Sequence, residues 1–503
     1  MYNGQEELDN LVWDRNDEES EVAQNQLRLK TFCRKVEEFT QQKFGKPARL
    51  ISPLIFGGFN VLYRMRVEGL SPDVMVRLPC PSLVQFPREK TIYEAATALL
   101  VAEQTQLPVP RHLFFDQDSI LGPFIIMEYQ DHCGSISARL TRPAENPSDP
   151  HVLDPNVSET LLDEIWGRVA SCLLQLSQLT FPRIGSLVQI DQGTYEVASR
   201  PLPHNMTDMI RLANIPECVL PAKGKTYATA DEWYTALAEM HIAQLVFQHN
   251  DLVTSESDCR NKYVSRQVFR RLAKEGRLST FGFAQDTWSS QSSKIPPGTL
   301  CSCPSNTDSF RLWGDDFRAG NILLNESDEI AALIDWEFTY VAPTQFILDP
   351  PWWLLLETAE MWSPDLDGWK VTYESRLKTW LSAMEKAEVS SAVPTPDGLS
   401  APLSRYMRES WQTGRFFLSY AARKSWVFDA MYWNFLDERF FGDRGTHVLK
   451  DDLWKTRVHL LTEEERMAME PFVRRKMAEA KDRRILEWGV EDAKGRFSEL
   501  LFD

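Results

Sequence analysis

The sequence lacks the cysteine and histidine patterns of a metal-binding or disulfide-linked protein. Its eight cysteines are scattered over 503 residues, only Cys301 and Cys303 lie close together, and no Cys-x-x-Cys pair occurs. With no histidine cluster beside them, these cysteines match neither a structural zinc site nor a disulfide framework. We therefore expect a reducing compartment and predict that the protein is cytoplasmic.

Long apolar runs and an excess of basic residues are also missing. No stretch approaches the roughly 18 uninterrupted apolar residues of a membrane span. The first residues, MYNGQEELDN, lack the basic start and apolar core of a secretory signal. A formal net charge of −17 disfavours nucleic acid as a partner. The remaining composition is that of a globular protein, and the length indicates two or three domains or lobes.

The segment RLWGDDFRAGNILLNESDEIAALIDWE carries the most informative pattern. Residues 321–324 and 330–334 are predicted to form two strands joined by a polar turn, so a hairpin brings Asp335 close to Asn321. Amide and carboxylate oxygens that converge in this way suit Mg²⁺. Asp316, just upstream, is left free to accept a proton from a hydroxyl. This layout is that of phosphoryl-transfer catalysis.

Alternatives remain open for this segment. Asp-x-x-x-x-Asn is common in loops because both residues favour turns. Asp315 stands beside Asp316 and is a second candidate for the base, although the spacing to Asn321 favours Asp316.

Three features upstream add to the pattern. Gly57 and Gly58, in FGGFNVLYR, permit a turn whose backbone can approach phosphate oxygens, although an ordinary hairpin turn would look the same. Arg77 lies late in the apolar strand VMVRLP, where its planar fork could hold phosphates unless it points to solvent from an edge strand. Glu94 in the following helix is the expected partner of Arg77, with Glu89 as a rival.

Two predicted helices, at 21–44 and 88–105, flank the strands of this first region, which we expect to be a small, mostly antiparallel sheet. The strand GPFIIMEY ends at Glu128 and Tyr129, whose backbone would offer hydrogen bonds to adenine at a hinge. A proline-rich linker is predicted at 142–155. Beyond it the periodicity is helical, and the aromatic-rich residues 404–440 are interpreted as core packing.

In this order of motifs the sequence resembles the aminoglycoside phosphotransferase family of the protein-kinase-like fold, and most of all its large fungal group. The resemblance spans roughly residues 50–355. The segments that carry it are FGGFNVLYR, VMVRLP, QTQLPVPRHLFFD, LGPFIIMEY, FPRIGSL, GDDFRAGNILLN, IDWEFTYVAP and LDPPWWLL.

The resemblance implies an α+β, two-lobed fold and an ATP-dependent phosphotransferase that acts on a hydroxyl of a small molecule. Residues 1–45 would form a helical extension, 46–135 the nucleotide-binding lobe with a small antiparallel sheet, and 136–503 the mainly helical lobe for catalysis and substrate. The implied cofactors are ATP and Mg²⁺, with no nucleic acid or membrane as partner.

The resemblance also implies roles for individual residues. Asp316 matches the aspartate that orients or deprotonates the acceptor hydroxyl, and Asn321 and Asp335 match the two magnesium ligands. Arg77 matches the phosphate-binding cation, and Glu94 matches its helix partner.

The sequence departs from the family at two positions. Gly314-Asp315-Asp316 stands where the family usually has His-Gly-Asp, and Arg77 stands where lysine is usual. These departures motivate a rival hypothesis, a nucleotide-binding scaffold with impaired catalysis, although the retained Asp316, Asn321 and Asp335 argue against it. Protein kinase activity is disfavoured because no Asp-Phe-Gly triplet follows the second strand. Aminoglycoside, choline-like amine, sugar and hydroxyamino acid all remain open as acceptors.

Overall fold

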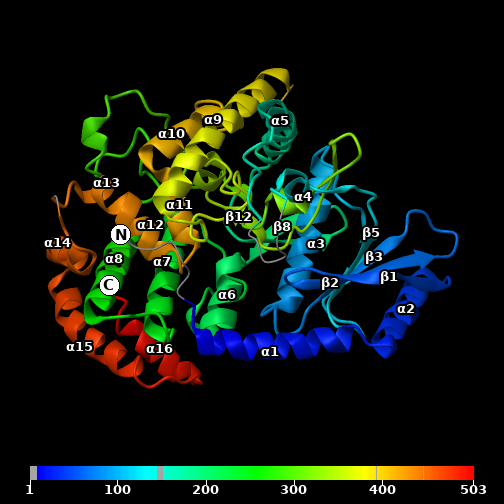
Figure 1. The fold of residues 1–503 in the computed structure, drawn as a ribbon, viewed down its shortest axis with the longest axis horizontal. Coiled ribbons are helices and arrows are strands. Elements are labelled where there is room, and N and C mark those ends of the chain that lie inside the picture. The colour runs from blue at the N-terminus through cyan, green and yellow to red at the C-terminus, as the bar shows by residue number, and fades with distance from the viewer. Residues whose placement is uncertain (1–7, 144–150, 392, 446, 503) are drawn as a thin grey trace.

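The smaller lobe is built on a five-stranded antiparallel sheet. The computed structural model describes residues 8–143, 151–391, 393–445 and 447–502. Figure 1 shows the sheet on one side of the molecule and a larger, mainly helical lobe on the other. The strands pair in the order β1-β2-β3-β5-β4. Their bounds are β1 (Ala48–Phe56), β2 (Asn60–Val67), β3 (Val74–Pro79), β4 (His112–Asp116) and β5 (Phe124–Glu128).

The alternation of residue types explains how β2 lies in this sheet. Val61, Tyr63 and Met65 are buried, whereas Arg64 and Arg66 lie on the more exposed face. The neighbouring strand β3 is buried along most of its length, because β2 pairs with one edge and β5 with the other. Any side chain on β3 is therefore in the middle of the sheet.

The helix predicted over residues 21–44 is wrong in its bounds. Two helices form instead, α1 (Asn10–Leu27) and α2 (Lys30–Phe44). The side chain of Asp9 accepts a hydrogen bond from the backbone N of Val12 at 3.1 Å and so caps α1. The periodicity missed this start because α1 has a polar sequence without a continuous apolar face.

Helix α1 contacts both lobes, and Figure 1 shows it running beneath them. At its start, Asn250 donates to the carboxylate of Asp9 at 3.0 Å. At its end, the hydroxyl of Tyr63 on β2 donates to the backbone O of Leu27 at 2.8 Å. Within α1, Nη2 of Arg15 donates to Oδ1 of Asn214 at 3.3 Å and Nδ2 of Asn16 donates to the backbone O of Arg211, so polar side chains make contacts with the helical lobe.

The larger lobe consists mainly of helices, which confirms the helical periodicity predicted beyond the linker. Helix α3 (Pro87–Gln104), which follows the pattern predicted at 88–105, belongs to the sheet lobe. The other helices are α4 (Ile136–Leu140), α5 (Glu159–Leu176), α6 (His204–Ala213), α7 (Ala230–Phe247), α8 (Glu256–Lys274), α9 (Leu366–Ser390), α10 (Leu403–Thr413), α11 (Arg415–Arg423), α12 (Phe428–Met431), α13 (Asp437–Phe441), α14 (Leu453–Arg457), α15 (Glu463–Glu479) and α16 (Val490–Ser498).

Short strands position the loops between the lobes. The predicted hairpin is present as β10 (Ile322–Leu324) and β11 (Ile330–Leu333), and β10 also pairs with β6 (Gly134–Ser135). Strands β9 (Arg311–Gly314) and β12 (Thr339–Ala342) pair antiparallel and so hold both ends of the segment between them. A further hairpin is made by β7 (Ser186–Asp191) and β8 (Thr194–Ser199).

The observed architecture confirms the predicted α+β fold class, with a small antiparallel-sheet lobe and a larger, mainly helical lobe. The aromatic side chains of residues 404–440 are buried, as predicted, and Phe417 stacks on Phe435 with ring centroids 4.2 Å apart. Part of the predicted linker, 144–150, lies outside the described residues. Among the helices that are described, none combines the length and apolar character needed to cross a membrane.

Candidate active site

The β10–β11 hairpin brings Asn321 and Asp335 together, as the sequence predicted. The backbone N of Ile334 donates to the backbone O of Asn321 at 3.0 Å, which joins the two ends of the hairpin. Asp335 has a φ of 63°, in the left-handed region. Aspartate tolerates this conformation better than most residues, and here it turns the chain sharply just after the strand.

Arg77 lies at the centre of the site and is only 6% exposed. Its Nε is 2.9 Å from Oε1 of Glu94 on α3, and its Nη2 contacts Oδ1 of Asp335. Because β3 is a central strand, the alternative of a solvent-facing edge residue is wrong. Glu89, the rival partner, pairs instead with Arg200 at 2.8 Å.

Sequence reasoning missed a second layer of this site. Lys90 on α3 and Glu337 form a buried ion pair, with side chains 1% and 2% exposed. Asn60 on β2 joins them: it donates to Glu337 Oε2 at 2.9 Å and accepts from Lys90 Nζ at 2.9 Å. Glu337 Oε2 also lies 3.3 Å from Nη2 of Arg77. A contact between a strand, a helix and the segment after β11 has no local sequence signal except the i, i+4 spacing of Lys90 and Glu94.

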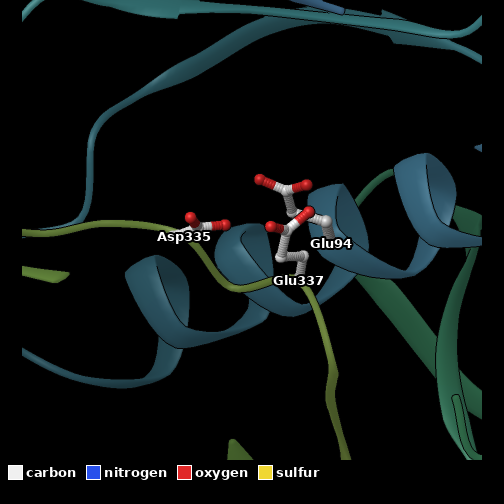
Figure 2. Close-up of side chains that lie close together, drawn as sticks. All are labelled: Glu94, Asp335 and Glu337. Carbon is white, nitrogen blue, oxygen red and sulfur yellow. The ribbon is translucent and has the colours of Figure 1, made fainter. Parts of the chain in front are cut away.

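Three carboxylates from two parts of the chain thus converge at one point. Figure 2 shows Glu94 on α3 facing Asp335 and Glu337 on the segment after β11. One oxygen of each lies within 4.8 Å of the others. Arg77 and Lys90 are close enough to neutralise two of the three charges, which is why this cluster can exist in a buried place.

The electrostatics distinguish Asp335 from Glu337. Burial raises the pKa of Asp335 well above its usual range, and Glu337 and Glu94 add to this effect while Arg77 opposes it. Burial also acts on Glu337, but Lys90 and Arg77 outweigh it and lower the pKa of Glu337 to about 2. Asp335 is therefore the carboxylate whose ionised form has most to gain from a nearby divalent cation.

The donor set fits a magnesium ion. Asn321 donates through Nδ2 to the backbone O of Asp316 at 2.8 Å and to its Oδ2 at 3.0 Å. This arrangement commits the amide nitrogen and leaves Oδ1 of Asn321 as an acceptor. Together with the carboxylate of Asp335 it provides the hard oxygen ligands that Mg²⁺ prefers.

The two neighbouring aspartates have different surroundings. Asp315 is 8% exposed and accepts hydrogen bonds from Nε1 of Trp313 at 2.7 Å and from the backbone N of His204 at 3.1 Å. Asp316 is 22% exposed and accepts from Nε of Arg318 at 2.6 Å. Asp315 is thus held inside the lobe, and the geometry favours Asp316 as the residue that meets an acceptor.

A cleft of about 310 Å³ contains most of the predicted nucleotide-binding residues. Its lining residues include Gly57, Arg77, Glu94, Glu128, Tyr129, Asn321 and Asp335. Gly58 does not line it. Neither Gly57 nor Gly58 has a positive φ, and an added Cβ would meet nothing closer than 3.5 Å. The turn itself therefore does not require glycine. The lack of a side chain is useful at this turn only if a bound group approaches the backbone from the cleft.

Comparisons with known proteins give similarity to solved structures only. No protein-family model matches the chain, and no curated protein matches it in sequence. Similar structures are a macrolide 2'-phosphotransferase type I (12% identity, 82% of this chain and 96% of that chain, TM-score 0.37), the aminoglycoside phosphotransferase APH(4)-Ia with AMP-PNP and hygromycin B (13%, 87% and 97%, 0.37), and Plasmodium vivax ethanolamine kinase (12%, 91% and 96%, 0.39). They are phosphotransferases and small-molecule kinases, the kind of protein that the sequence resembles. At these scores the likeness concerns the general course of the chain.

Proposed function

We propose that the protein is an ATP-dependent phosphotransferase that phosphorylates a hydroxyl group of a small molecule. The observation that carries the proposal is the meeting of Arg77 from the sheet lobe with Asn321 and Asp335 from the hairpin in one cleft. Residues 46–135 would bind the nucleotide, and 136–503 would bind the acceptor and catalyse transfer. Residues 1–45 would be a helical extension.

Each group has a separate task in this reaction. The backbone at Glu128 and Tyr129 would bind adenine, and Arg77 would bind phosphate oxygens through its planar fork. Asn321 and Asp335 would hold Mg²⁺, which when bound neutralises charge on the phosphates. Asp316 would take the proton of the acceptor hydroxyl. Catalysis would thus come from positioning and charge stabilisation.

A nucleotide-binding scaffold is the second candidate. Its support is the contact of Arg77 with Asp335, which ties a predicted phosphate ligand to a predicted metal ligand. In an enzyme, Mg·ATP must compete with this contact. The side chain of Asp335 is 19% exposed, so a ligand in the cleft can reach it.

Arg77 is expected to contribute much of the affinity for Mg·ATP. Mg·ATP should stabilise the wild-type protein against thermal unfolding by an amount that grows with ligand concentration. Arg77→Lys should keep part of this stabilisation because the charge remains, and Arg77→Ala should lose most of it. Arg66→Ala, on the outward face of β2 with a side chain 68% exposed, is the control and should respond like wild type. Equal Mg·ATP affinity in wild type and Arg77→Ala would overturn the assignment.

A further inference from the structure

A second, smaller cavity lies in the helical lobe on the other side of the site. Its volume is about 70 Å³, and its walls are mostly apolar. We call it the apolar cavity and define it by Leu176, Trp313, Phe317, Trp336, Asp349 and Met407. These residues come from the end of α5, from both loops of the candidate active site, from the segment after β12 and from α10.

The apolar cavity adjoins the reacting groups. Trp336 lines both this cavity and the nucleotide cleft, and it directly follows Asp335. Gly314 and Phe317, on either side of Asp316, line the apolar cavity, whereas Asn321 lines the nucleotide cleft. The loop that carries Asp316 therefore passes from one cavity to the other. A reaction between two bound molecules needs two adjacent binding sites, and these two cavities are adjacent.

Asp349 is the one acidic side chain among the residues that line the apolar cavity, and it is 5% exposed. Its Oδ1 accepts a hydrogen bond from the hydroxyl of Ser410. Burial raises the pKa of Asp349 although the hydroxyls of Ser410 and Ser419 oppose this effect, and among the described residues none makes a well-aligned hydrogen bond to Oδ2. A buried carboxylate oxygen without a partner is costly, so its presence in a cavity indicates a ligand group that donates to it.

The charges around Asp349 restrict the nature of that donor. The positive charges of Arg415 and Arg423 both act to lower the pKa of Asp349. The guanidinium of Arg423 also lies 4.2 Å from the ring centroid of Trp313, on the cavity wall. Burial still keeps the pKa of Asp349 above its ordinary value, but the two guanidinium groups nearby would repel a further ammonium. A neutral hydroxyl satisfies Oδ2 without adding charge.

We propose that the apolar cavity is the acceptor subsite and binds the hydrocarbon part of a small neutral alcohol, with a second hydroxyl that donates to Oδ2 of Asp349. This inference rests on the proposed function. A single water needs about 10–15 Å³, so 70 Å³ accommodates a few non-hydrogen atoms and excludes a whole aminoglycoside. In the reaction, the acceptor oxygen bonds to the γ-phosphorus as the bond from that phosphorus to the β–γ bridging oxygen breaks. ADP leaves, and the hydroxyl proton passes to Asp316.

Three probes of equal size test the proposal. These are 1,4-butanediol, 1-pentanol and 4-amino-1-butanol, which differ only in whether the second end is a hydroxyl, a methyl group or an ammonium. Binding to the full-length protein is followed by saturation-transfer NMR, which requires no turnover. We expect the diol to bind several-fold to about tenfold more tightly than pentanol, the range of one net hydrogen bond. The amino alcohol should bind most weakly.

Variants locate the binding in the cavity. Leu176→Phe, which fills the cavity, should weaken binding of all three probes. Leu161→Phe, on the same helix, also half-buried but outside the cavity, should leave it unchanged. Asp349→Asn should remove the preference for the diol over pentanol. A wild-type circular dichroism spectrum and a cooperative thermal unfolding transition check that each variant is folded.

The outcomes separate this inference from the proposed function. Equal binding of diol and pentanol, or no effect of Leu176→Phe, would mean that the cavity holds only ordered water, and the inference would be wrong. Tightest binding of the amino alcohol would refute the neutral class. If the diol binds as expected but no acceptor is ever phosphorylated, the proposed function fails and the subsite stands. If an acceptor is phosphorylated with the same kcat/KM in wild type and folded Leu176→Phe, the reverse holds.

Discussion

Replacing Asp316 with asparagine is expected to leave Mg·ATP binding unchanged and to lower the rate of phosphoryl transfer by about 10²–10⁴-fold, the usual contribution of a general base. The change preserves size and removes the carboxylate that would accept the proton. Nucleotide binding should persist, because Asp316 does not line the cleft that contains Arg77 and Asp335. Single-turnover transfer and nucleotide titration, made on the same preparation, measure the two effects separately.

Two companion variants make this test decisive. Asp335→Ala should lose both transfer and metal-dependent nucleotide binding. Without this carboxylate the protein would hold Mg²⁺ poorly, and the charge of the phosphates would not be neutralised. Asp315→Asn should reduce stability rather than chemistry, since Asp315 accepts from Trp313 and His204 inside the lobe. If Asp315→Asn stops transfer while Asp316→Asn keeps the wild-type rate, the two roles are reversed.

Replacing Lys90 with methionine is expected to lower the free energy of unfolding by about 3–5 kcal/mol, the cost of leaving one member of a buried ion pair alone. Methionine is similar in length but cannot compensate the carboxylate of Glu337, which is 2% exposed. Denaturant unfolding of wild type and variant gives the difference directly.

Helix α3 offers a matched control for this substitution. Arg88 pairs with Asp118 at 2.7 Å, with side chains 65% and 62% exposed. Arg88→Met should cost less than about 1 kcal/mol, as is usual for surface pairs. The double variant Lys90→Met with Glu337→Gln should recover part of the loss, because the uncompensated charge is gone. A cost for Lys90→Met no larger than that for Arg88→Met would contradict the buried network.

The parts of the site that the sequence predicted are those with a local pattern. The hairpin that joins Asn321 to Asp335 follows from two apolar runs and a polar turn, so their proximity could be expected. The position of Arg77 on a buried strand likewise follows from the apolar residues around it. The predicted roles of these residues stay predictions until they are tested.

The parts that the sequence did not predict depend on distant contacts. Lys90, Asn60 and Glu337 meet only because α3, β2 and the segment after β11 pack together. Helix α1 was placed wrongly because contacts with the helical lobe, rather than an apolar face, stabilise it. The different surroundings of Asp315 and Asp316 were also hidden, since the lobe that encloses Asp315 is built from segments far along the chain.

The most direct test of the central claim is ATP consumption by the full-length protein with Mg²⁺ across a library of small alcohols, polyols, amino alcohols and sugars. We expect the wild type to convert at least one hydroxyl compound to its phosphate ester with release of ADP, and folded Asp316→Asn not to do so. If the wild type binds Mg·ATP yet transfers phosphate to no compound in the library, or if Asp316→Asn is as active as wild type, the claim that Asp316 catalyses phosphoryl transfer in this protein is contradicted.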